Sequence, residues 1–257
     1  MNPWPHPLWI AHRGAGKLAP ENTLAAFRVG ASHGYRAFEC DVKLAADGVP
    51  FLLHDTELQR TTDASGIAGR RPWTELSRLD AGSWHSSAYA GEPPASLSAL
   101  ASYCIANGFA LDLEIKPTPG QELETGRVVA REAARLWAGA PSSRPSLPPA
   151  PLPFLSSFRP ESLQGAMETA PQFARALLLN EPWDGWFDVA RQLACVACVT
   201  RHDLMDETMA QTLHAAGMHA LVYTVNDAAE AQRLLRLGVV GIVTDAVDRF
   251  DPRVGVG

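Results

Sequence analysis

Leu8-Trp-Ile-Ala-His-Arg-Gly14 is a short apolar run that ends in a histidine and an arginine. Three later apolar runs also end in charged residues, at Glu39-Cys-Asp41, His54-Asp55 and Glu114-Ile-Lys116. Short apolar runs of this kind predict β-strands. An α/β barrel brings the C-terminal ends of its strands to one mouth, where it builds its active site. We therefore expect these side chains to lie together, a combination that suits metal-assisted chemistry on a phosphate ester.

Strand patterns alternate with helical patterns along the whole chain, which predicts a parallel sheet with crossover helices. We expect eight strands, at Leu8–His12, Ala37–Val42, Ala110–Lys116, Pro153–Ser157, Arg175–Leu179, Cys195–Thr200, Ala220–Val225 and Gly241–Thr244. A barrel of eight such units needs about 250 residues, and the chain has 257. No Gly-x-Gly-x-x-Gly follows the first strand, which disfavours a dinucleotide-binding sheet. The sequence predicts a TIM (β/α)8 barrel that forms a single domain over residues 1–257.

Two segments interrupt the alternation. Val49–His54 has the pattern of an extra strand, and the polar stretch at about residues 55–95 predicts a small insertion after the second strand unit. Because this insertion follows a strand, we expect it on the C-terminal face, where it can roof the site. The Pro- and Ser-rich linker Ala138–Pro153 joins a helix to the next strand. We expect that linker on the opposite face, away from the catalytic residues.

Composition disfavours several classes of function. A net charge of −6 and a pI near 5.7 argue against nucleic-acid binding and against stable association with an anionic membrane. No stretch approaches eighteen consecutive apolar residues, and the N-terminus lacks the pattern of a signal peptide. The four cysteines do not suit a disulfide framework in a chain of this length. We expect a cytoplasmic enzyme that acts on a small molecule.

The acidic residues at the strand ends predict a metal site. Successive side chains of a strand point to opposite faces, so Glu39 and Asp41 project to the same face of their strand, and so do Asp112, Glu114 and Lys116 of theirs. Three carboxylates at one mouth repel one another unless a cation lies between them. Oxygen ligands favour a hard divalent cation. We predict that Glu39, Asp41 and Glu114 hold one divalent cation.

Basic residues accompany the predicted acidic cluster. The alternative to a metal is a salt-bridge network in which Arg13, Lys43 and Lys116 neutralise the acids. Beside a metal, Arg13 and Lys116 are candidates for binding the non-bridging oxygens of a phosphate. His12 and His54 end neighbouring strand units, and two imidazoles suit general acid–base chemistry at a P–O bond. We predict that His12 and His54 are the catalytic pair.

In their order and spacing, these motifs resemble the glycerophosphodiester phosphodiesterase family. The matching residues are Ala11-His-Arg-Gly14, Pro20-Glu-Asn-Thr23, Glu39-Cys-Asp41, Asp47-Gly48, His54-Asp55, Arg60-Thr-Thr62, Leu113-Glu-Ile-Lys116, Ser156-Ser-Phe158 and Val222-Tyr-Thr-Val-Asn226. The resemblance runs from about Leu8 to Asp248. Residues 16–26 and 80–84 look most like the cytosolic bacterial enzymes linked to glycerol-3-phosphate uptake. The resemblance implies a TIM barrel of the phospholipase-C-like phosphodiesterase type. It also implies metal-dependent hydrolysis of glycerophosphodiesters, such as glycerophosphocholine and glycerophosphoethanolamine, to glycerol 3-phosphate and an alcohol.

By motif position, the resemblance implies the same site residues: catalytic His12 and His54, metal ligands Glu39, Asp41 and Glu114, and Arg13 and Lys116 near the phosphate. The implied cofactor is one divalent cation, Mg²⁺ or Ca²⁺, with Mn²⁺ as a further option. Tyr223 stands where many members carry Trp, so it is a candidate for the wall that faces the substrate. Two other functions stay open: a phosphodiesterase for lysophospholipids, and a non-catalytic barrel that senses glycerol phosphates. The sequence leaves the oligomeric state open.

Overall fold

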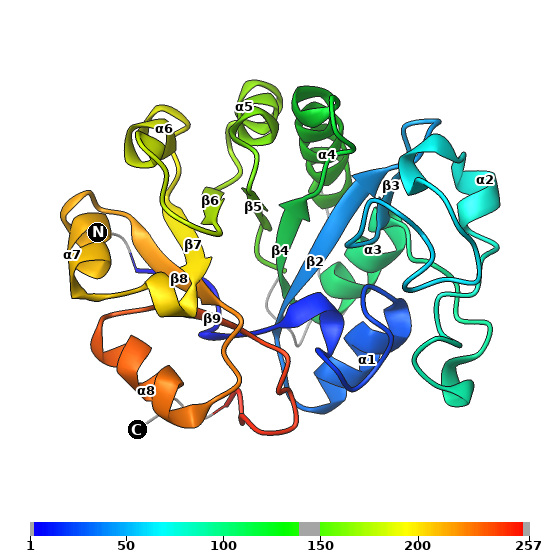
Figure 1. Cartoon of the computed structure of the whole chain (residues 1–257), viewed down its shortest axis with the longest axis horizontal. Helices are drawn as coiled ribbons and strands as arrows, with labels where there is room; N and C mark the ends of the chain where they lie inside the picture. Colours follow the sequence, from blue (N-terminus) through cyan, green and yellow to red (C-terminus); the bar gives the residue numbers. More distant parts are fainter. Residues whose placement is uncertain (1–2, 139–149, 254–257) are drawn as a thin grey trace.

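Eight parallel strands close into a barrel in the computed structural model, which describes residues 3–138 and 150–253 (Figure 1). Within these residues, the barrel strands are β1 (Trp9–Ala11), β2 (Ala37–Leu44), β4 (Ala110–Ile115), β5 (Phe154–Ser157), β6 (Arg175–Leu179), β7 (Ala197–Arg201), β8 (His219–Tyr223) and β9 (Gly241–Thr244). Strand β1 closes the ring because it pairs with both β2 and β9. The predicted TIM barrel is confirmed.

The predicted strand bounds agree with the structure to within two residues. Those of β6 and β9 are the same. Strand β7 begins at Ala197 rather than at the predicted Cys195. The backbone N–H of Cys195 donates to the carbonyl oxygen of Ala190 in the preceding helix, so it is not available to the sheet. All four cysteines of the chain are buried free thiols.

The extra strand predicted at Val49–His54 is β3 (Pro50–Leu52), which runs antiparallel to β2. Strand β3 pairs with the C-terminal part of β2, at Val42 to Leu44. Strand β1 pairs with β2 nearer its N-terminal end, at Phe38. The long strand β2 therefore extends beyond the ring and carries β3 on its upper edge. This arrangement delivers the residues after β3 to the C-terminal mouth of the barrel.

Alternating strand residues give the barrel two hydrophobic layers. The side chains that the sequence assigns to the outer face of β2 and β4 pack with the helices, among them Phe38, Cys40 and Leu113. A separate inner cluster takes apolar residues from all eight parallel strands: Ile10, Ala37, Ala110, Phe154, Ala176, Leu178, Ala197, Val199, Leu221 and Val243. Since Ala37 precedes Glu39 on the inner face, this cluster fills the barrel beneath the acidic residues.

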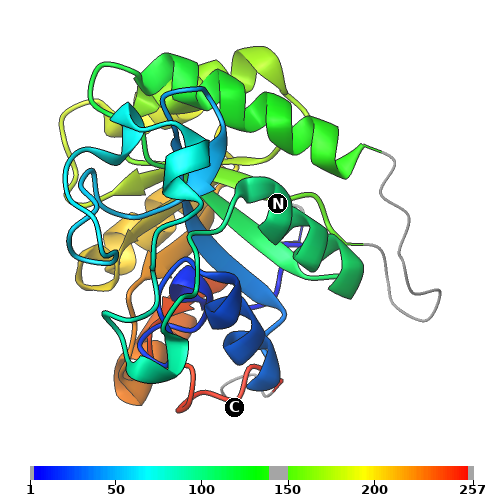
Figure 2. The ribbon, with the colours of Figure 1, turned by 90° about the vertical axis from the view of Figure 1, so that its right-hand side faces the viewer.

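Seven helices of at least seven residues surround the strands within the described parts of the chain (Figures 1 and 2). They are α1 (Leu24–Ser32), α3 (Leu97–Asn107), α4 (Glu122–Trp137), α5 (Pro160–Thr169), α6 (Trp186–Gln192), α7 (Glu207–Ala215) and α8 (Ala228–Arg236). Thr23 caps α1, because its side chain accepts a hydrogen bond from the backbone N–H of Ala26. None of the helices in the described residues is long and apolar enough to cross a bilayer.

The predicted insertion packs beside the mouth, against the loop after β1 and the start of α1. It includes the short helix α2 (Trp73–Leu76). The carboxylate of Glu92 accepts a hydrogen bond from the backbone N–H of Ala25, at 3.0 Å, and His85 Nε2 lies 3.1 Å from the carbonyl oxygen of Lys17. Most of the predicted linker Ala138–Pro153 lies outside the described residues.

Candidate active site

Three carboxylates meet at the C-terminal mouth, as the strand pattern predicts. Glu39 and Asp41 come from β2 and Glu114 from β4, and parallel pairing sets Asp41 directly beside Glu114. One carboxylate oxygen from each residue lies within 4.8 Å of the other two. All three residues are buried. Oxygen atoms at this spacing match a site for a hard divalent cation.

Two of the three basic side chains in the salt-bridge alternative, those of Arg13 and Lys116, contact this acidic cluster. Arg13 Nε lies 3.4 Å from Asp41 Oδ2. Lys116 Nζ lies 2.9 Å from Glu114 Oε1 and 3.6 Å from Asp41 Oδ1. Lys43, the third cation of that alternative, donates instead to the carbonyl oxygen of Lys116, at 3.3 Å.

Glu39 is the one acid of the three that forms no ion pair with arginine or lysine within the described residues. Its Oε2 atom accepts a hydrogen bond from the backbone N–H of Arg13, at 2.9 Å. Its Oε1 atom is buried and has no hydrogen-bond partner among the described residues. A buried carboxylate oxygen without a partner is costly, and a cation among the three acids would satisfy it. The donor set therefore fits a divalent metal better than a salt-bridge network alone.

The pKa shifts of the three acids show how closely they interact. Burial, together with the neighbouring Asp41 and Glu114, raises the pKa of Glu39 well above its ordinary value. Burial also raises the pKa of Glu114, although Lys116 opposes this effect. Burial disfavours ionisation of Asp41 too, but Arg13 and Lys116 outweigh it and hold the pKa of Asp41 below its usual range. Like charges at this distance are expected to act in this way.

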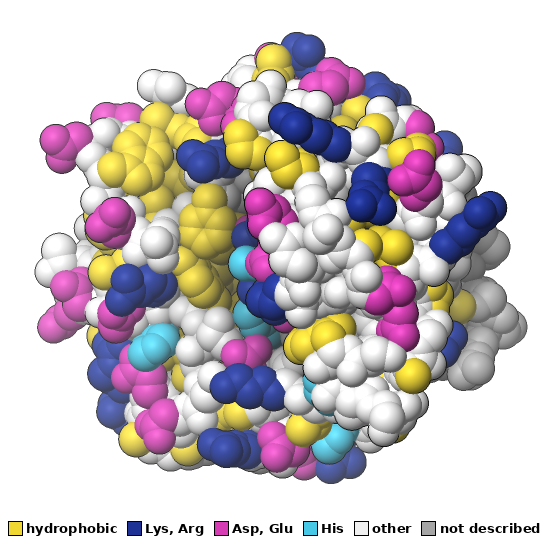
Figure 3. All heavy atoms as spheres, turned by 45° about the vertical axis from the view of Figure 1, so that its right-hand side comes forward, with side chains coloured by type: hydrophobic (Ala, Val, Ile, Leu, Met, Phe, Trp, Pro, Cys, Tyr) yellow, Lys and Arg dark blue, Asp and Glu magenta, His cyan; other side chains and the backbone are white. Residues whose placement is uncertain are grey.

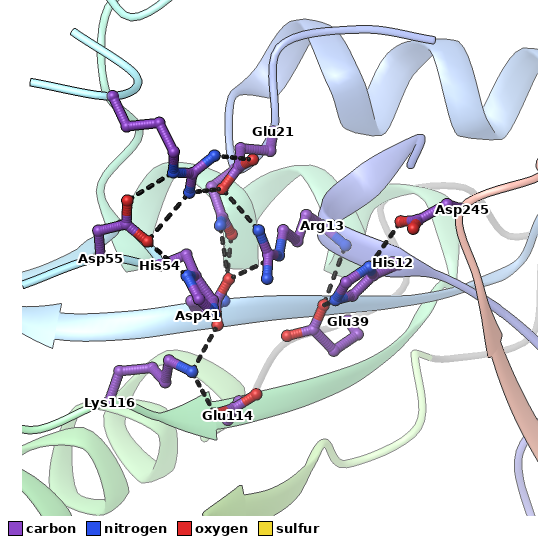
Figure 4. Close-up of polar contacts among 12 residues, drawn as sticks. His12, Arg13, Glu21, Glu39, Asp41, His54, Asp55, Glu114, Lys116 and Asp245 are labelled. Atoms are coloured by element: carbon purple, nitrogen blue, oxygen red, sulfur yellow. Dashed lines mark hydrogen bonds and ion pairs between the residues drawn. The ribbon is translucent and has the colours of Figure 1, made fainter. Parts of the chain in front are cut away.

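His12 follows β1, and a carboxylate on the neighbouring strand unit orients it (Figure 4). Its Nδ1 atom lies 2.7 Å from Oδ1 of Asp245, the residue that directly follows β9. Its Nε2 atom lies 3.8 Å from Glu39 Oε2. The next residue, Arg13, has a positive φ of 51°, and this turn of the backbone places the Arg13 N–H against Glu39.

His54 reaches the mouth from the other side of the acidic cluster, after β3. Its Nδ1 atom lies 2.7 Å from Asp55 Oδ1. Burial, with the charges of Lys116 and Arg13, lowers the pKa of His54. Each histidine thus has a carboxylate at Nδ1. That contact favours the tautomer with a proton on Nδ1 and leaves Nε2 to exchange a proton.

A cavity of about 400 Å³ lies at the mouth between these groups. Both histidines, Arg13, Lys116 and the acids Glu39 and Glu114 line it, and its opposite wall is largely apolar, with Phe158, Leu178, Val199, Tyr223 and Val243. Figure 3 shows a hollow on this face with histidine and charged side chains at its wall and hydrophobic side chains along one rim. The Tyr223 hydroxyl donates to the carbonyl oxygen of Leu179, so its ring, rather than its hydroxyl, is presented to the cavity.

The structure brings together all eight residues predicted for the site: His12, Arg13, Glu39, Asp41, His54, Glu114, Lys116 and Tyr223. Sequence reasoning assigned no role to Asp245, which holds His12. The signal was present, because Asp245 directly follows a strand, as His12 does. Sequence reasoning also assigned no role in the site to Asn22, whose side chain makes two hydrogen bonds with Asp41, at 2.7 and 3.1 Å.

Known proteins share this sequence pattern and fold. The model of the glycerophosphoryl diester phosphodiesterase family matches residues 12–249. YhdW of Bacillus subtilis is 30% identical over 245 residues, which cover 93% of this chain and 94% of that protein. A glycerophosphodiester phosphodiesterase of Caldanaerobacter subterraneus is 27% identical over 246 residues, with 93% of each covered. The structure of an Oleispira antarctica phosphodiesterase in complex with the product sn-glycerol-3-phosphate matches with a TM-score of 0.84 and 31% identity, over 95% of each chain.

Proposed function

This chain belongs to the glycerophosphoryl diester phosphodiesterase family, and from this premise we propose that it hydrolyses glycerophosphodiesters to glycerol 3-phosphate and an alcohol. Glycerophosphocholine and glycerophosphoethanolamine are the proposed substrates. The observation that carries the proposal is that two carboxylate-oriented histidines line one cavity beside a cluster of three acids, two of which also line it. The Oleispira relative in complex with sn-glycerol-3-phosphate supports the proposed product.

We propose that Glu39, Asp41 and Glu114 hold one divalent cation, Mg²⁺, Ca²⁺ or Mn²⁺. Two observations support this assignment: the Glu39 Oε1 atom is buried without a hydrogen-bond partner, and one oxygen of each acid lies within 4.8 Å of the other two. The chemistry that such a cation supplies is polarisation of a phosphoryl oxygen and a lower pKa for the attacking oxygen. The Arg13 backbone N–H, bonded to Glu39 Oε2, fixes the orientation of that ligand, and the Asn22 amide does the same for Asp41.

His12 and His54 are the proposed acid–base pair, and a carboxylate in contact with each ring orients it for this role. Asp245 and Asp55 hold the two Nδ1 atoms, so each Nε2 is the nitrogen that can exchange a proton at the substrate. One histidine removes the proton of the attacking oxygen, and the other protonates the departing alkoxide. The attacking oxygen is that of water or of the neighbouring glycerol hydroxyl, which would give a transient cyclic phosphate.

Arg13 and Lys116 are proposed to bind the phosphate. Both line the cavity beside the acids, where their charges offset that of the non-bridging oxygens as it grows in the transition state. The ring of Tyr223 lies against that of Phe158, with centroids 5.8 Å apart, and forms part of the apolar wall. This wall is proposed to contact the non-reacting parts of the diester.

A coupled assay for glycerol 3-phosphate tests the proposal. The purified protein is treated with chelator, and Mg²⁺, Ca²⁺ and Mn²⁺ are restored one at a time with several glycerophosphodiesters. His12→Gln and His54→Gln should each lower kcat by at least about a hundredfold, whereas His33→Gln, at an exposed position, should not. Near-normal turnover in both site variants contradicts the acid–base assignment.

The same assay separates the two other functions. Faster release from lysophosphatidylcholine than from glycerophosphocholine would indicate a phosphodiesterase for lysophospholipids. Binding of glycerol 3-phosphate without hydrolysis of any diester would indicate a sensor. Action in the cytoplasm, the lack of stable membrane or nucleic-acid binding, and a single domain over residues 1–257 stay part of the proposal. The net charge of −6 supports the lack of stable binding to nucleic acid or to an anionic membrane surface.

A further inference from the structure

Arg60 lies in the segment after β3 and does not line the catalytic cavity, yet its guanidinium contacts two carboxylates at once. Nη1 and Nη2 donate to the two oxygens of Glu21, at 2.7 Å each. Nη2 and Nε donate to the two oxygens of Asp55. A planar guanidinium can satisfy two carboxylates in this paired manner, and an ammonium group cannot.

Each of these two carboxylates holds a residue of the proposed site. Asp55 Oδ1 lies 2.7 Å from His54 Nδ1. Glu21 Oε1 accepts a hydrogen bond from Arg13 Nη1, at 2.8 Å. Arg60 is therefore one side chain removed from both a proposed catalytic histidine and a proposed phosphate-binding arginine. These two residues come from different strand units, and Arg60 connects them from outside the cavity.

We propose that Arg60 is a positioning residue, which orients His54 through Asp55 and Arg13 through Glu21; this inference rests on the proposed function. Without the guanidinium, Glu21 and Asp55 are like charges with no shared partner, so they repel each other. Asp55 then no longer has a fixed orientation, and His54 loses the contact that selects its tautomer. Arg60 is exposed, and exposed ion pairs contribute little to stability. The loss is therefore expected in the geometry of the site rather than in folding.

The chain offers a matched control for Arg60. Arg201 ends β7 at the same mouth, and its guanidinium also donates to both oxygens of one carboxylate, that of Asp203. The side chains of Arg60 and Arg201 are 43% and 47% exposed. The test compares Arg60→Ala, Arg60→Lys and Arg201→Ala. The control loses the same kind of surface ion pair, but within the described parts of the chain the Asp203 side chain makes no hydrogen bond or ion pair with a residue of the proposed site.

The first measurement needs no activity. Nitrogen-15 NMR of the histidine rings reports the tautomer of each imidazole, with His54→Gln to assign the His54 signals. In the wild type, His54 should carry its proton on Nδ1. In Arg60→Ala its signals should shift toward a mixture of tautomers, whereas those of His12, held by Asp245, should not change. His54 signals that are the same in the wild type and in Arg60→Ala would overturn the inference.

The second measurement is kcat/KM for glycerophosphocholine at a saturating concentration of the divalent cation. Arg60→Ala should lower it by about tenfold or more, since small displacements of reacting groups are costly. Arg60→Lys should recover only part of the loss, and Arg201→Ala should stay within about twofold of the wild type. Equal losses in Arg60→Ala and Arg201→Ala would overturn the inference. If the wild type hydrolyses no glycerophosphodiester, the proposed function fails, and the NMR comparison alone decides whether Arg60 positions His54.

Discussion

Loading the acidic cluster with a divalent cation should stabilise the folded protein. Unfolding separates Glu39, Asp41 and Glu114, so a cation held by all three would bind the folded state alone. At a free concentration one hundred times its Kd, a ligand of this kind adds about 2.7 kcal/mol. For a chain of this size, that free energy corresponds to a rise in Tm of about 5–10 °C. Differential scanning calorimetry in chelator, and then with each cation restored, measures the shift.

The Glu39→Gln variant tests whether the acidic cluster is responsible for the rise in Tm. The amide oxygen can still accept the hydrogen bond from the Arg13 N–H, so the variant removes charge and little else. Burial and the neighbouring acids raise the pKa of Glu39, and in chelator a neutral Gln should therefore leave Tm unchanged or higher. The cation-induced rise should disappear. Glu230→Gln, which removes an acid outside the cluster, should keep that rise in full. A wild type whose Tm does not respond to any cation, or an equal response in Glu39→Gln, refutes the metal site.

Three further predictions concern folding. Burial lowers the pKa of His6 from 6.5 to about 4, so the unfolded chain takes up the proton first as pH falls. The free energy of unfolding should therefore fall by at most about 3 kcal/mol as the pH is lowered from 6.5 to about 4. Urea titrations at several pH values measure this fall, and an equal fall in a His6→Phe variant would contradict the prediction. Gly126→Ala would place a Cβ 1.9 Å from the Ser162 carbonyl oxygen and should cost about 1–3 kcal/mol; an unchanged Tm would show that α4 and α5 can separate. Thr23→Ala removes the cap of α1 and should lower the free energy of unfolding, measured by urea titration, by about 1 kcal/mol. A variant as stable as the wild type would contradict this prediction.

The alternation of strand residues made the acidic cluster predictable. In β2, Phe38 and Cys40 had to face the helices, so Glu39 and Asp41 had to face the barrel interior. The same argument placed Glu114 on the inner face of β4. A period of two leaves only two choices for each side chain, and hydrophobic burial selects between them. The family resemblance added the chemistry of the substrate, which strand geometry does not supply.

The partners of the site residues were less predictable. Asp245 lies 233 positions from His12 in the sequence, and they meet only because β1 and β9 pair to close the ring. The contacts of Arg60 depend on where the segment after β3 packs. A side chain in an irregular segment has no fixed period to indicate its direction. Its hydrogen-bond partners therefore follow from tertiary packing.

Local sequence patterns were enough to predict the number and order of the strands, the face on which each acid lies, and the two histidines at strand ends. These are consequences of local periodicity and of burying apolar surface. Three features depend on how distant segments pack: Glu39 keeps an oxygen without a hydrogen-bond partner, Asp245 and Asp55 orient the histidines, and one arginine connects two strand units. Closure of the barrel brings distant residues within hydrogen-bond distance, and no local pattern in the chain encodes those distances.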